Sequence, residues 1–206
     1  MIHSVFIVDD HPLICAGIQA LLHAYDYSVA GIANKGDLLI SELHHAQPDV
    51  VLLDLTMPGR AGIPLIADIK RILPQQKIIV FTASESLFYQ RCCLQLGVEG
   101  YVCKRGDLET LLTAIKEVER GKRFYPVTHS AADAAELIES EKLMSLTRRE
   151  LIVLVKLASG MSNKEIASQL QLSSKTISTY KIKILRKLGL KGISGINTAA
   201  RANDLV

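Results

Sequence analysis

The sequence predicts an α/β protein, in which a doubly wound, five-stranded parallel sheet is followed by a small all-α domain. Over residues 1–122, short apolar runs alternate with stretches of helical periodicity, the pattern of a sheet with helices on both faces. Four of the apolar runs end on polar residues, at the edge where such sheets bind ligands. Residues 145–206 instead show short helical periods and a strong basic charge.

Five apolar runs are expected to be strands, because runs of this length suit strands buried on both faces. They span residues 4–8, 29–33, 49–53, 77–81 and 100–103. Polar side chains close four of these runs. They are Asp9 with Asp10, then Asp54, Thr82 and Lys104.

Helices are expected between and after these strands, at residues 12–25, 36–45, 62–73, 86–96 and 107–120. Pro12 suits the first turn of a helix, where its missing N–H removes no hydrogen bond. Asp107 is expected to cap the last of these helices and Gly121 to end it.

The run VVLLDLTMPG places Asp54 at the end of the central strand. Since the C-terminal ends of parallel strands share one edge, the polar residues that close the strands should converge there. Clustered carboxylates repel each other unless a cation lies between them, and hard oxygen ligands suit Mg²⁺. Asp54 could then act as a nucleophile that accepts a phosphoryl group, with Lys104 and the Thr82 hydroxyl stabilising the added charge.

These residues resemble the receiver domain of two-component response regulators, a flavodoxin-like fold also seen in CheY, over residues 3–122. The resemblance implies that Asp54 is the phosphoacceptor and that a sensor histidine kinase or phosphotransfer domain supplies the phosphoryl group from a phosphohistidine. It also implies a switch role for Thr82, Lys104 and the aromatic Tyr101. The Mg²⁺ ligands implied by the family are Asp9, Asp10, Asp54 and the backbone carbonyl of Thr56. Arg105 follows the lysine where receivers often have proline, so no cis-proline is expected there.

Charge separates the chain into three parts. Residues 1–122 carry a net charge of −3, residues 123–144 carry −2, and residues 145–206 carry +8. We expect residues 123–144 to be a linker, helical over 131–144, in which Phe124–Pro126 could dock on the receiver. A basic domain behind an acidic one indicates a polyanionic partner for the basic domain alone.

Residues 145–206 are expected to form four short helices. Thr147 and Glu150 have the spacing of a capping box, which begins a helix that ends near residue 159. A second helix runs from Ser162 to residue 170, a third over 175–188 and a fourth over 194–202. A short helix, a tight turn and a basic helix make a helix-turn-helix, whose last helix fits the DNA major groove.

This part resembles the DNA-binding domain of the NarL/FixJ (LuxR-type) regulators, through LTRRE, SGMSNKEIASQL and SSKTISTYKIKILRKLGL. The ISTYK stretch is similar to the BvgA/EvgA-like branch. Ser178 stands where lysine is usual and Tyr180 where histidine is usual. The resemblance implies a homodimer on double-stranded promoter DNA, and RNA polymerase stays open as a further partner. The expected DNA contacts are Lys164, Lys175, Thr176, Ser178, Thr179, Tyr180, Lys181, Lys183 and Lys187.

The N-terminus, the length of the apolar runs and the cysteines favour a location in the cytoplasm. The N-terminus has no signal-peptide pattern and no apolar run is long enough to span a membrane. The four cysteines have no metal-site spacing and are expected to be buried thiols, with Cys103 open to a redox role.

Two other functions compete with a phosphorylation-controlled regulator. A phosphatase or phosphotransferase with an aspartate nucleophile usually carries a second aspartate two residues later, where this chain has Thr56. We therefore expect that this protein is not an enzyme. A regulator that senses a small molecule needs an aromatic-lined pocket, and this chain has no tryptophan.

Overall fold

The computed structural model describes residues 3–57, 61–126 and 145–202. By their contacts, these residues form two compact units. The first comprises the described parts of Met1–Glu85 and Leu96–Thr128, and the second those of Ser86–Gln95 and His129–Val206. The predicted linker helix at 131–144 lies outside the described residues.

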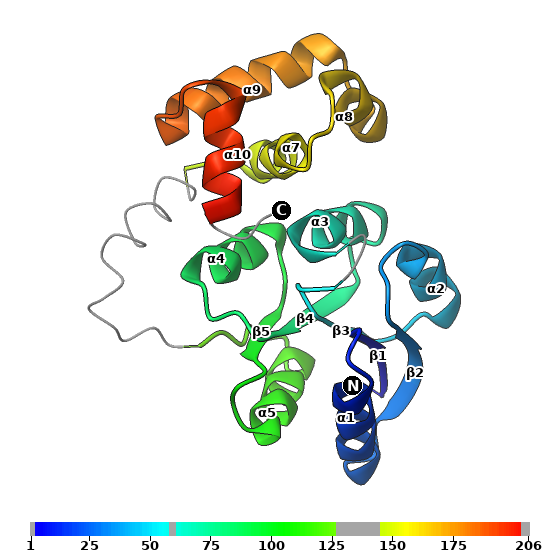
Figure 1. The fold of residues 1–206 in the computed structure, drawn as a ribbon. Helices are drawn as coiled ribbons and strands as arrows, with labels where there is room; N and C mark the ends of the chain where they lie inside the picture. The colour runs from blue at the N-terminus through cyan, green and yellow to red at the C-terminus, as the bar shows by residue number, and fades with distance from the viewer. Residues whose placement is uncertain (1–2, 58–60, 127–144, 203–206) are drawn as a thin grey trace, which may run out of the picture. The chain divides into compact units, whose positions relative to one another are not determined.

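A five-stranded parallel sheet forms the centre of the first unit, with strand order β2-β1-β3-β4-β5, which confirms the predicted fold class (Figure 1). The strands are β1 (Ser4–Val8), β2 (Ser28–Ala33), β3 (Val50–Leu53), β4 (Lys77–Thr82) and β5 (Gly100–Cys103). Every residue of β3 is buried, as expected of a central strand that is covered on both faces.

Helices alternate with the strands along the chain. They are α1 (Pro12–Ala24), α2 (Leu39–Ala46), α3 (Gly62–Ile72), α4 (Leu87–Leu96) and α5 (Leu108–Glu119). Helices α1 and α5 lie on one side of the sheet and α2 and α3 on the other (Figure 1). The core under α1 and α5 is mainly aliphatic, with Ile18 and Leu22 of α1 and Leu111 and Ile115 of α5 packed on alternate residues of the strands.

The helix boundaries follow local chemistry. Asp107 caps α5 by accepting a hydrogen bond from the Glu109 amide, and Gly121 follows the helix with a φ of 76°, both as predicted. Helix α2 begins at Leu39 instead of residue 36. Its N-cap, Leu38, has no capping side chain, and the preceding Gly36 and Asp37 have low helix propensity.

The segment that follows α5 pairs with β5. Phe124 accepts a hydrogen bond from the Tyr101 amide at 2.7 Å and donates to the Glu99 carbonyl at 3.0 Å. Tyr125 stacks on Tyr101, with ring centroids 6.3 Å apart, and its hydroxyl donates to the Val98 carbonyl. The predicted docking of this segment on the receiver is therefore confirmed for these two residues.

The second unit contains the helices α7 (Arg148–Ala158), α8 (Asn163–Leu170), α9 (Ser174–Leu188) and α10 (Gly192–Ala202). Capping boxes begin α7, through Thr147 and Glu150, and α8, through Ser162 and Glu165. Helices α8 and α9 are joined by a tight turn, because Gln171 adopts a left-handed conformation, with φ of 54°. The apolar residues Leu151, Ile166, Ile177, Ile184 and Ile196 form the core of this unit.

Two sequence-based expectations concern the whole chain. Among the described residues, no helix is both long enough and apolar enough to cross a membrane. All four cysteines are free thiols, and Cys15, Cys92 and Cys93 are buried. Burial raises the pKa of Cys92 and of Cys93 well above that of an ordinary thiol.

Candidate functional site

Asp9 and Asp54 lie next to each other because of the register between β1 and β3. Val8 pairs with Leu53, and the amide of Asp54 donates to the Val8 carbonyl at 2.9 Å. The two aspartates that follow this pair are 3% and 1% exposed. Two carboxylates are thus held side by side at the C-terminal edge of the sheet, where they repel each other unless a cation separates them.

Lys104 supplies a positive charge between these two carboxylates. Its amide donates to the Thr82 carbonyl at 2.7 Å, which fixes the start of the loop after β5. Its Nζ lies 2.7 Å from Oδ2 of Asp54 and 2.7 Å from Oδ2 of Asp9. Burial lowers the pKa of Lys104, but the hydrogen bonds and charges of Asp54 and Asp9 outweigh burial and raise this pKa above its ordinary value.

The acidic cluster, which we define as Asp9, Asp10 and Asp54, has the composition of a cation site. Together with His11, each of these residues offers one ligand atom, and the atoms all lie within 4.8 Å of one another. Oδ1 of Asp10 is buried without a hydrogen-bond partner, although Nδ1 of His11 lies 2.9 Å away without the geometry of a hydrogen bond. A buried carboxylate oxygen without such a partner fits a hard cation such as Mg²⁺.

Thr56 contacts Asp54 through two groups. Its amide donates to Oδ1 of Asp54 at 3.2 Å, and its hydroxyl lies 3.2 and 3.3 Å from the two carboxylate oxygens. The family resemblance implied only the backbone carbonyl of Thr56 as part of the site. The hydroxyl contact is an addition, which could be found from the two-residue spacing alone.

Thr82 and Tyr101 lie on the adjacent strands β4 and β5, and both are completely buried. The Tyr101 hydroxyl donates to the Ser84 carbonyl at 2.9 Å, so that the ring lies under the loop after β4. Because Tyr125 stacks on the same ring, any movement of Tyr101 changes the packing of the segment after α5.

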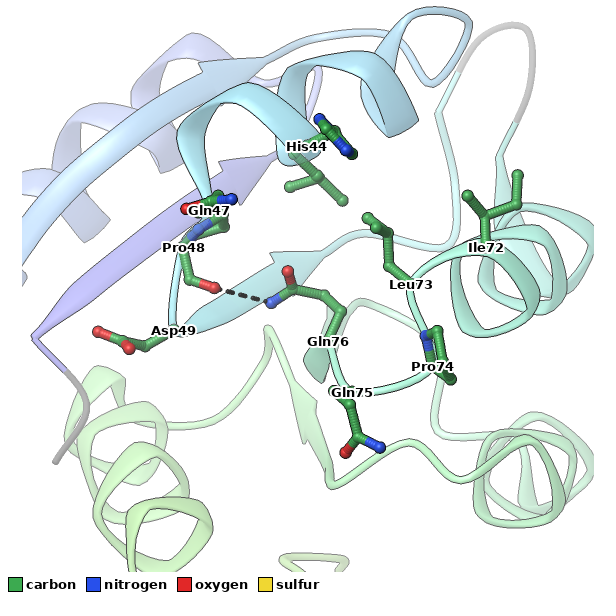
Figure 2. A pocket seen from close by; sticks show the side chains of 10 residues that line it. His44, Gln47, Pro48, Asp49, Ile72, Leu73, Pro74, Gln75 and Gln76 are labelled. Carbon is green, nitrogen blue, oxygen red and sulfur yellow. Dashed lines mark hydrogen bonds between the residues drawn. The ribbon is translucent and has the colours of Figure 1, made fainter.

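A separate hollow of about 510 Å³ lies at the opposite edge of the sheet, between α2 and α3. Figure 2 shows His44, Ile72, Leu73 and Gln76 around it, with the Gln76 amide donating to the Pro48 carbonyl at 3.0 Å. Asp49 also lines it. This hollow contains none of the predicted site residues.

The carboxylate of Asp49 is already bonded to β1. The amides of His3 and Ser4 donate to its Oδ2 at 2.8 and 2.9 Å, and these bonds hold the pKa of Asp49 below its ordinary value. Asp49 therefore holds the start of β1 in place. The predicted site residues of the receiver lie at the other edge of the sheet, which carries Asp54.

Helix α9 carries all but one of the expected DNA contacts of the second unit. Lys175, Thr179, Lys183 and Arg186 are exposed and recur at helical spacing along one face. Lys164, on α8, is also exposed, whereas Thr176, Ser178, Tyr180 and Lys181 are partly buried. The structure thus brings several of the expected contacts to a single basic face.

Lys187 differs from the other lysines of α9, because its ammonium group bonds within the domain. Its Nζ lies 2.6 Å from Oε2 of Glu150 and 2.7 Å from the Ser145 carbonyl. Burial raises the pKa of Glu150, but the hydrogen bonds from Lys187 and Thr147 outweigh burial and lower this pKa below its ordinary value. No local sequence pattern predicts this pair, which joins α7 to α9.

Two family descriptions match the two parts of the chain. Residues 5–116 match "Response regulator receiver domain", and residues 144–200 match "Bacterial regulatory proteins, luxR family". The chain belongs to the NarL/FixJ response regulators. The receiver match includes α4, which groups with the second unit by its contacts.

Known proteins align with this response regulator over nearly its whole length. A relative from Pseudomonas aeruginosa is 36% identical and covers 98% of this chain and 99% of its own. The DNA-binding transcriptional activator EvgA of Escherichia coli is 28% identical, with 98% and 99% covered. The structure of RcsB from Salmonella enterica serovar Typhimurium bound to promoter rprA has a TM-score of 0.64 at 30% identity, with 97% and 99% covered.

This chain is therefore a DNA-binding transcriptional regulator with a receiver domain, as the sequence predicted. Family members are transcription regulators and not enzymes.

Proposed function

We propose that Asp54 accepts a phosphoryl group from the phosphohistidine of a sensor kinase or phosphotransfer domain, and that this transfer controls promoter binding by residues 145–206. A carboxylate oxygen of Asp54 attacks phosphorus, the bond from phosphorus to the histidine nitrogen breaks, and the acyl phosphate remains on Asp54. The observation that carries this proposal is the position of Lys104 Nζ, 2.7 Å from both Asp54 and Asp9 at the C-terminal edge of the sheet.

The residues around Asp54 each have a role in this step. Mg²⁺ bound by the acidic cluster and the Thr56 carbonyl would neutralise negative charge on the phosphoryl group. Lys104 is already charged and adjacent to Asp54, so its ammonium can move to a phosphoryl oxygen. The Thr82 hydroxyl, next to the site, can donate a second hydrogen bond to that group.

Phosphorylation then changes the charge of a buried site by about −1.5 to −2. We infer that Thr82 and Tyr101 shift in response, and that Tyr125 is displaced with Tyr101 because the two rings stack. A coupling free energy of about 1–3 kcal/mol would alter DNA affinity by about 5–150-fold.

The DNA-binding step uses α8 and α9 as a helix-turn-helix. The basic face of α9 would enter the major groove, with Lys175, Lys181 and Lys183 near phosphates. A dimer would place two such helices on an inverted repeat, and RcsB has been seen as dimers bound to DNA.

The phosphoacceptor is tested by labelling the full chain with acetyl phosphate and Mg²⁺, followed by separation of the phosphorylated form on a phosphate-binding gel. We expect Asp54→Asn to abolish labelling. The matched control is Asp26→Asn, since Asp26 lies in an exposed turn with φ of 61°, which asparagine also adopts readily. Undiminished labelling of Asp54→Asn would mean that another residue accepts the phosphoryl group.

A further inference from the structure

The basic face of α9 has an apolar centre. Ile182 is 67% exposed and lies on the same face as Thr179 and Arg186, at spacings of three and four residues, with Lys183 next to it in the sequence. A single exposed apolar residue is ordinary on a protein surface. This one is notable for its position, because it lies between Thr179 and Arg186 on the helix that we assign to DNA.

The hydroxyl groups beside Ile182 are already used as donors within the protein. The Thr179 hydroxyl donates to the Lys175 carbonyl at 3.0 Å. The Ser178 hydroxyl donates to the Ser174 carbonyl at 3.0 Å and accepts a hydrogen bond from the side chain of Asn163, also at 3.0 Å. Neither hydroxyl has a proton left to donate to a base edge.

What Thr179 and Ile182 present outward is therefore mainly hydrocarbon. The Oγ1 of Thr179 points toward the backbone of the preceding turn. Its methyl group therefore points in another direction, and Thr179 as a whole is exposed. In the major groove, the apolar feature that distinguishes one base pair from another is the C5-methyl group of thymine.

We propose that Ile182, together with the methyl group of Thr179, contacts thymine methyl groups and so sets the base preference of this regulator. The inference rests on the proposed DNA-binding function of α9 and adds the kind of base that it recognises. Lys175, Lys183 and Arg186 provide attraction to any duplex, whereas the apolar patch of Ile182 and Thr179 supplies discrimination between sequences.

Burial of one methyl group contributes enough free energy to change an affinity about fourfold. A duplex with thymine at a position that contacts the patch should therefore bind the protein about fourfold more tightly than the same duplex with uracil at that position. Uracil pairs with adenine in the same way and lacks only that methyl group, so this replacement isolates the contact.

The experiment begins with selection of duplexes by the full-length protein, activated with beryllofluoride and Mg²⁺. Thymines of the selected site are then replaced one at a time by uracil, and the dissociation constant is measured for the wild type and for Ile182→Ala. We expect about fourfold weaker binding by the wild type at one or more thymines in each half-site. Ile182→Ala should bind the thymine duplex more weakly and lose the difference between thymine and uracil.

Lys183→Ala is the matched control from the same face. It should weaken binding to both duplexes equally and keep the ratio between thymine and uracil. If Ile182→Ala keeps the wild-type ratio at every position, or if no replacement affects the wild type, the assignment of Ile182 is wrong while the proposed function stands. If the activated wild type selects no duplex at all, both are wrong. Because Ile182 is exposed, the variant should fold, which its circular dichroism and melting temperature would verify.

Discussion

The two ends of this protein use charge in opposite ways. In the receiver, Asp9, Asp54 and Lys104 are largely removed from water and paired at 2.7 Å, which fixes them at one point in space. On α9, Lys175, Lys183 and Arg186 are exposed along one helix face. Buried pairs define a chemical site, since their interactions are strong and directional, whereas exposed charges create a field that salt screens.

Lys187 and Glu150 show that this contrast does not simply follow the domain boundary. Their pair lies in the basic domain but resembles the receiver, because Glu150 is only 4% exposed and its partner lies 2.6 Å away. The surroundings of a charge, more than its sequence context, decide whether it stabilises the fold or attracts a ligand.

Replacing Lys104 should destabilise the receiver most. In Lys104→Met, two buried carboxylates lose their shared cation, and breaking such a pair is expected to lower the free energy of unfolding by about 3–5 kcal/mol. Added Mg²⁺ should restore part of this loss, because it would supply the missing positive charge. Hydrogen exchange of the β1 and β3 amides, with and without Mg²⁺, measures both effects for this domain alone.

The control for Lys104 is Lys122→Met. Lys122 pairs with Glu117 at 3.1 Å, but its side chain is 66% exposed, so the change should be within about 1 kcal/mol. Equal losses for the two variants would contradict the contrast between buried and exposed charge.

Removing the charge of Glu150 should have the next largest effect, in the DNA-binding domain. Glu150→Gln weakens charged hydrogen bonds, so we expect the free energy of unfolding to fall by about 1–3 kcal/mol at pH 7. The pKa of Glu150 is lower in the folded state than in the unfolded chain, so its contribution is present at neutral pH and is lost as the pH falls below about 4.3 through the folded value.

The measurement is the stability of α7 and α9 between pH 7 and pH 3. The difference between wild type and Glu150→Gln should shrink on acidification. Glu165→Gln is the matched variant, because Glu165 has the same place in the capping box of α8 but is exposed. A difference that stays constant with pH would rule out the assigned role of the Glu150 carboxylate.

The smallest effect on stability is expected for Lys183→Ala, which should change the free energy of unfolding by no more than about 0.5 kcal/mol. Its effect should fall on DNA, where the slope of log affinity against log salt decreases in magnitude by about 1. Lys187→Ala should do the reverse, with lower stability and an unchanged slope. A reduced slope for Lys187→Ala would support the sequence-based assignment of Lys187 to DNA.

Much of the receiver could be predicted because its signals are local. Continuous apolar runs predicted all five strands to within one residue, and parallel register then brings Asp9, Asp54, Thr82 and Lys104 to one edge. The capping residue Thr147 was found from its spacing to Glu150, and Asp107 was found because aspartate is a preferred residue at helix N-caps.

What the sequence did not predict depends on tertiary contacts or on side-chain direction. The pair between Lys187 and Glu150 joins residues 37 positions apart on two helices. The commitment of the Ser178 and Thr179 hydroxyls to backbone carbonyls is a rotamer choice that spacing does not reveal. The stacking of Tyr125 on Tyr101 requires the segment after α5 to return to β5.

We propose that charge added at Asp54 controls DNA binding by α9. The direct measurement is the dissociation constant of the full chain for its selected site, with and without phosphorylation by acetyl phosphate, for the wild type and for Asp54→Asn. We expect phosphorylation to change the dissociation constant of the wild type by about 5–150-fold and that of Asp54→Asn not at all. An unchanged wild-type affinity, or an equal change in Asp54→Asn, would contradict it.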